Sequence, residues 1–115
     1  MFTIYHNPRC SKSREALALL QQHSEQVNVI EYLKTPPSVA ELAALLKKLN
    51  LSARQLLRSK EDEYQQLKLD NPALSEQQLL AAMQQHPKLI ERPIVVCGQR
   101  AVIGRPLSNV EALLP

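Results

Sequence analysis

A cysteine at position 10 stands where an apolar segment gives way to an amphipathic one. Residues 11–23 place alanine and leucine at helical spacing, so Cys10 falls at the start of a predicted helix. Unpaired backbone N–H groups and the positive end of the helix dipole favour an anionic sulfur there. Further positive charge comes from Arg9, Lys12 and Arg14. Because the thiolate is the reactive form of cysteine, Cys10 is the candidate nucleophile.

Three arginines lie at the ends of predicted secondary-structure elements. Arg58 ends a short predicted helix, whereas Arg92 and Arg105 each directly precede a proline, one on either side of a predicted hairpin. A planar guanidinium can meet two oxygens of a tetrahedral oxyanion at once. Ligands of a βαβ sheet collect where strands lead into helices, which is where Cys10 lies. Convergence of the arginines there would hold an oxyanion against a thiolate.

The remaining cysteine and histidines offer weaker signals. Cys97 ends an apolar strand and is interpreted as a small core residue. Two cysteines supply neither a disulfide framework nor a four-thiolate zinc site, so we expect no metal, while one disulfide between them is left open. His6 precedes the cysteine loop, where loop packing and support of the thiolate are equally good interpretations. His23 and His86 lie at predicted helix ends, where surface or capping roles are expected.

The elements that must position these residues alternate in type. A strand, a helix and a second strand make a right-handed parallel unit, and two later strands around Gly98-Gln99 make an antiparallel hairpin. Ser108 is the predicted cap of a final helix. The sequence predicts one domain over residues 1–115 with an α/β fold, namely a thioredoxin-like core of order β-α-β then β-β-α, a mixed sheet, and a helical insertion. In chain order, the predicted segments are 2–5, 11–23, 27–32, the insertion 38–86, 94–97 and 101–103.

The length, composition and charge of the chain limit the classes of function that it can have. The chain has 115 residues, of which 44% are hydrophobic and 22% charged, as in a globular domain. No apolar run reaches the ~20 residues of a membrane span, and the start lacks the core of a secretory signal. We therefore expect a cytoplasmic protein without membrane contact. We also expect a monomer. The net charge of +3 comes with scattered basic residues, three tyrosines and one phenylalanine, so it does not indicate nucleic-acid binding. A small anionic substrate fits that charge equally well.

The chain resembles the glutaredoxin-coupled arsenate reductases of the thioredoxin-like superfamily, and within them a short branch. The resemblance runs over nearly the whole chain, and the order of its motifs makes it specific. One departure is Ser11-Lys12, which stands where well-studied members have Gly-Thr. The matching residues are Ile4-Tyr5-His6-Asn7-Pro8, Cys10, Ser13-Arg14, Tyr32-Leu33, Pro36-Pro37, Leu56-Leu57-Arg58, His86-Pro87, Leu89-Ile90, Arg92-Pro93-Ile94-Val95-Val96 and Arg105-Pro106.

This resemblance implies an arsenate reductase that acts on arsenate or a similar oxyanion. Cys10 would be the nucleophile, and Arg58, Arg92 and Arg105 would bind the anion. Glutathione would be the co-substrate and glutaredoxin the protein partner, with no bound cofactor.

Five further residues would support the site by the same resemblance. His6 would support the thiolate, and Pro93 would be the cis proline of thioredoxin-like folds. Ser13 occupies the position of the resolving cysteine in dithiol redox proteins. Asn7 and Arg14 flank the cysteine within the matched motifs.

Two alternatives belong to other functional classes. One is an RNA-polymerase-binding regulator of the same superfamily, although such regulators typically carry a Cys-x-x-Cys pair that Ser13 interrupts here. The other is a glutathione-linked thiol enzyme that acts on a different oxyanion or on a mixed disulfide.

Overall fold

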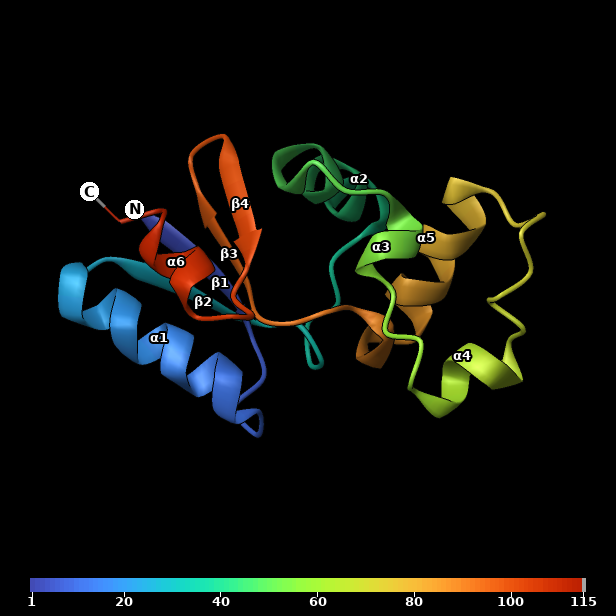
Figure 1. The fold of residues 1–115 in the computed structure, drawn as a ribbon, viewed down its shortest axis with the longest axis horizontal. Helices are drawn as coiled ribbons and strands as arrows, with labels where there is room; N and C mark the ends of the chain where they lie inside the picture. Colours follow the sequence, from blue (N-terminus) through green and yellow to red (C-terminus); the bar gives the residue numbers. More distant parts are fainter. Residues whose placement is uncertain (115) are drawn as a thin grey trace. The chain divides into compact units, whose positions relative to one another are not determined.

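The structure, a computed structural model, describes residues 1–114 and contains two compact units (Figure 1). The sheet unit consists of residues 1–35 together with the segment that begins at Arg92. The helical unit consists of Pro36–Glu91.

The sheet unit carries a four-stranded mixed sheet of order β2-β1-β3-β4. Strand β1 pairs in parallel with β2 and antiparallel with β3, which continues antiparallel into β4. The parallel pair requires a crossover, which α1 supplies. The predicted thioredoxin-like α/β fold is confirmed. The elements are β1 (Phe2–His6), α1 (Ser11–His23), β2 (Val27–Glu31), β3 (Ile94–Cys97), β4 (Arg100–Ile103) and α6 (Ser108–Glu111).

Both helices of the sheet unit pack on one face of the sheet. Alternate residues of a strand share a face, so Phe2 and Ile4 of β1 lie beside Val95 of β3. That face meets Ala16 and Leu20 of α1, which lie four residues apart on one side of the helix. Val110 and Leu113 close the same apolar cluster from the C-terminal segment. The side chains of β1 and α1 that point into this apolar cluster therefore face each other. The C-terminal end of β1 and the start of α1 lie at the same end of the sheet.

The helical unit is held together by leucines, and its longer helices begin at serine caps. A capping box formed by Ser38 and Glu41 starts α2, and equivalent boxes start at Ser52 and Ser75. Helices α2 and α5 contact each other and α3. The elements are α2 (Val39–Leu49), α3 (Ala53–Leu56), α4 (Asp62–Gln66), α5 (Glu76–Gln85) and a 3₁₀ turn, η1 (Pro87–Leu89).

The predicted cap of the final helix is wrong. Ser108 is the first residue of α6 rather than its cap, because Leu107 already has helical backbone angles of φ −57° and ψ −28°. The Asn109 side chain joins α6 to the end of β4, since its Nδ2 donates to the carbonyl of Ile103 at 2.9 Å. Among residues 1–114, no helix combines the length and apolar character needed to cross a membrane.

Candidate active site

Cys10 is the N-cap residue of α1, with an extended backbone at φ −96° and ψ 122°. Its carbonyl accepts the first helical hydrogen bond from the Arg14 N–H at 3.0 Å. Among the residues that the structure describes, no side chain caps this helix start, and the first turn contains no acidic residue. The first-turn amides of a helix lack intrahelical acceptors, and together with the helix dipole they favour a bound anion. The half-buried Cys10 therefore adjoins a helix start whose free amides and dipole favour a negative charge.

The loop from β1 to α1 is built by Asn7 and Arg14. The Asn7 carbonyl accepts from the Cys10 N–H at 3.0 Å, and its Oδ1 accepts from the Arg9 N–H at 3.0 Å. Arg14 Nη1 donates to the Pro8 carbonyl at 2.9 Å. Both residues thus hold the backbone that carries the cysteine.

His6 and Ser13 form the buried support of that loop. His6 continues the inward face of β1, and Ser13 begins the inward stripe of α1, so the fold brings them together. His6 Nδ1 lies 2.6 Å from Ser13 Oγ, which also accepts from the Asn7 N–H at 3.0 Å. Ser13 is fully buried, and its hydroxyl satisfies the part-buried N–H of Asn7.

The electrostatic state of His6 follows from its surroundings. Burial lowers the pKa of His6 below its ordinary value, opposed by the neighbouring Glu31 and assisted by Arg14. The imidazole is therefore neutral at pH 7, and its Nδ1 lone pair can accept the Ser13 hydroxyl proton. His6 thus supports the cysteine loop through position rather than through positive charge.

Arg92 and Arg105 lie at the end of the sheet from which the cysteine loop begins. Ile94, the first residue of β3, pairs with both Tyr5 and Ile103, so the start of β3 and the end of β4 adjoin the end of β1. Arg92 precedes that start and Arg105 follows that end. Arg92 is half-buried, with Nε and Nη1 shielded from solvent, whereas Arg105 is exposed.

A proline and a glycine shape this end of the hairpin. The Arg92–Pro93 peptide is cis, as the resemblance implied, and the Arg105–Pro106 peptide is cis as well, which the sequence analysis did not predict. The Gly104 N–H donates to the Pro93 carbonyl at 2.8 Å. A Cβ on Gly104 would lie only 2.9 Å from Pro93 Cγ. Sequence reasoning missed this role of Gly104, because the close approach is made by residues 11 positions apart.

Arg58 belongs to the helical unit. Its N–H donates to the Leu89 carbonyl at 2.8 Å, beside a bridge that pairs Leu57 with Ile90. Its guanidinium lies against Glu61 and Glu91. The sheet unit thus brings Cys10 to the same sheet end as Arg92 and Arg105, whereas the approach of Arg58 to them stays a prediction.

The two cysteines lie at opposite ends of the sheet, and both are free thiols. Cys97 pairs with Phe2 at the start of β1, whereas Cys10 follows the end of that strand at His6. Four residues of strand span about 13 Å, and disulfide-linked Cα atoms lie less than about 7 Å apart. The disulfide that the sequence left open is excluded in this fold.

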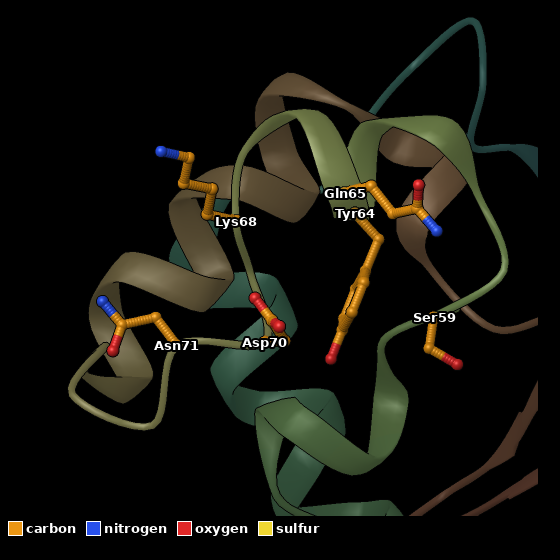
Figure 2. Close-up of a pocket in the computed structure, with 6 residues that line it drawn as sticks. All are labelled: Ser59, Tyr64, Gln65, Lys68, Asp70 and Asn71. Atoms are coloured by element: carbon orange, nitrogen blue, oxygen red, sulfur yellow. The ribbon is translucent and has the colours of Figure 1, made fainter.

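The helical unit also contains a hollow of about 700 Å³ (Figure 2). Figure 2 shows the Lys68 side chain extending away from Tyr64. None of the lining residues belongs to the predicted anion site. They are Ser59, Tyr64, Gln65, Lys68, Asp70 and Asn71.

The sheet order, the cysteine at the start of α1 and the cis proline before β3 together define a thioredoxin-like protein with a single cysteine at its site. Residues 5–113 match the ArsC family, and the chain belongs to that family. It is 52% identical over 112 residues to an arsenate reductase of Neisseria meningitidis, with 96% of each chain covered. The solved structure of an arsenate reductase from Vibrio cholerae is 52% identical, with a TM-score of 0.94 over 98% of this chain and 97% of the other. The YfgD protein of Escherichia coli, which is uncharacterised, is 54% identical over 108 residues, 93% of this chain and 91% of its own.

Proposed function

We propose that this protein is an arsenate reductase that uses glutathione and glutaredoxin as reductants. The observation that carries the proposal is the position of Cys10 at the uncapped start of α1, at the sheet end shared with Arg92 and Arg105. Relatives named arsenate reductase, at about half sequence identity over nearly the whole chain, support the choice of anion.

The first step forms a covalent bond between sulfur and arsenic. The arginines bind arsenate through its oxygens and orient it toward Cys10. The Cys10 sulfur attacks arsenic, an oxygen leaves as water, and arsenic remains in the +5 state. Guanidinium groups and helix amides stabilise the negative charge on the oxygens as the new bond forms. Phosphate fits the same groups, but a thiol does not reduce it, so chemistry rather than binding selects arsenate.

Two further thiols supply the two electrons. Glutathione replaces an arsenic-bound hydroxyl as water and forms a second arsenic–sulfur bond. The glutaredoxin thiolate then attacks the glutathione sulfur, a mixed disulfide forms, and the electron pair of the broken bond passes to arsenic. Water finally hydrolyses the remaining bond, which releases arsenite and the Cys10 thiol. In total, one arsenate and two thiols give arsenite, one disulfide and water.

External thiols are required because the chain offers no second thiol near Cys10. Ser13 stands at the position of a resolving cysteine, and its hydroxyl is committed to His6 and Asn7. Cys97 lies at the far end of the sheet. Each cycle therefore needs reductants from outside the protein.

A direct assay of arsenite tests this proposal. Purified protein is mixed with arsenate, glutathione and glutaredoxin, and arsenite is quantified over time, with each thiol omitted in turn. We expect arsenite only when both thiols are present. Arsenite at the background rate in the complete mixture contradicts the proposal, and full activity without glutaredoxin contradicts the choice of reductant.

A further inference from the structure

We propose that Glu61 and Glu91 are positioning residues that hold the Arg58 guanidinium and moderate its charge toward the bound anion. This inference rests on the proposed function, because it takes Arg58 to be an anion ligand. It concerns two carboxylates that the sequence analysis left without a role.

The contacts lie within the helical unit. Arg58 Nη1 is 3.4 Å from Glu61 Oε1, and Arg58 Nε is 3.6 Å from Glu91 Oε1. The Arg58 side chain is 21% exposed and both glutamates are 30% exposed, so solvent screens these pairs only in part. Two carboxylates on different nitrogens fix the plane of the guanidinium as well as its place. The third nitrogen, Nη2, carries two further N–H donors.

Backbone hydrogen bonds make this arrangement rigid. The Arg58 N–H donates to the Leu89 carbonyl at 2.8 Å, and the Glu91 N–H donates to the Leu56 carbonyl at 2.9 Å. The segments that carry Arg58 and Glu91 are thus joined directly, on both sides of the pair of Leu57 and Ile90.

Glu61 reaches Arg58 from a different element. It is the N-cap residue of α4, a position whose side chain commonly accepts from the helix amides. Here the Glu61 side chain makes no such cap, and its Oε1 accepts from Arg58 Nη1 instead. Glu61 comes three positions after Arg58, and its N–H donates to the Arg58 carbonyl at 3.4 Å. Glu61 therefore contributes to the position of Arg58 independently of Glu91.

The two roles of these carboxylates make opposite predictions for binding and catalysis. Removing a negative charge beside Arg58 leaves more positive potential, so a ground-state anion binds more tightly. Removing a contact lets the guanidinium move, so it meets the reacting oxygens less accurately and turnover slows. If a glutamate were merely structural, in contrast, its substitution would lower the stability of the protein and weaken both anion binding and turnover.

The experiment measures both properties in Glu91→Gln and Glu61→Gln, which keep the side-chain shape and remove the charge. Binding is measured by calorimetry with inorganic phosphate, an anion that the thiols do not reduce, at low and at physiological salt. Turnover is measured as arsenite formation with glutathione and glutaredoxin. Glu63→Gln is the matched control, since it removes the same charge from α4 two residues away from Glu61.

For each variant we expect a phosphate dissociation constant lowered about two- to fivefold at low salt, less so at physiological salt, together with a kcat lowered about three- to tenfold. The control should change neither value. A phosphate dissociation constant that stays unchanged or rises in both variants overturns the inference, and so does an unchanged kcat. If Glu91→Gln does not fold, Glu61→Gln decides alone.

Failure of the proposed function is visible separately, in the unsubstituted protein. Phosphate binding without arsenate turnover there refutes the proposed reaction, and this inference falls with it. An active unsubstituted protein whose glutamine variants resemble the control refutes only the role of the two glutamates.

Discussion

Gly104→Ala tests how tightly the end of the hairpin holds Pro93 and the adjoining Arg92. A Cβ at this position would lie 2.9 Å from Pro93 Cγ and 3.0 Å from Val110 Cγ2. Carbon atoms in optimal contact lie about 3.5–4.0 Å apart, so both neighbours would have to move by at least a few tenths of an ångström. Neither moves easily, because Pro93 is a buried ring and Val110 is a fully buried branched side chain.

Overpacking of this kind costs about 1–3 kcal/mol of unfolding free energy. At about 4 °C per kcal/mol for a domain of this size, the Tm should fall by roughly 4–12 °C. Displacement of Pro93 also moves the backbone of Arg92, so kcat/KM for arsenate should fall with it. The assays are thermal unfolding and arsenite formation.

Gly98→Ala is the matched control for this change. Gly98 has a φ of +61°, which costs an alanine about 1–2 kcal/mol, but an added Cβ would meet open space. Gly98 turns the hairpin at the end opposite the cysteine loop. Its alanine variant should therefore lose stability and keep its kcat/KM. A Gly104→Ala protein with unchanged Tm and unchanged activity would refute the packing argument.

Two further predictions concern His6 and Arg92. Because burial lowers the pKa of His6, the unfolded chain binds a proton that the folded protein excludes in the window just below the ordinary histidine pKa near 6.5. The contribution of neutral His6 to the free energy of unfolding is therefore fully present above the ordinary histidine pKa and is lost as the pH falls below it. The His6→Gln variant should lack this acid-induced loss of stability. Parallel pH profiles of the unfolding free energy for the two proteins would contradict the prediction. Arg92→Lys keeps the charge but loses the planar pair of donors, which should cost about 2–4 kcal/mol of transition-state stabilisation. The kcat/KM for arsenate should therefore fall roughly 30- to 1,000-fold. An unchanged kcat/KM would count against bidentate binding.

Local patterns predicted most of the fold. The strand 27–32 and the hairpin follow from β-branched residues and turns, and the serine caps mark the starts of α2, α3 and α5. Such signals act within a few residues, so a single sequence reveals them. The cap predicted at Ser108 failed because Leu107 already adopts helical angles after Pro106.

The candidate site was predictable only in part. The position of Cys10 follows from local sequence, and its grouping with Arg92 and Arg105 at one sheet end follows from strand order. The buried contact between Ser13 and His6 depends on how β1 and α1 pack, which no local pattern reports. Sequence spacing could have suggested Glu61, three residues after Arg58, but the contact of Glu91 with Arg58 arises only from tertiary structure.

The central claim is that the Cys10 sulfur is the atom that attacks the oxyanion, and that the second cysteine takes no part. Arsenite formation by Cys10→Ser and Cys97→Ser, with glutathione and glutaredoxin present, tests it most directly. We predict that Cys10→Ser falls to the background rate while Cys97→Ser keeps the rate of the unsubstituted protein. Arsenite production by Cys10→Ser, or its loss in a folded Cys97→Ser protein, would contradict the account.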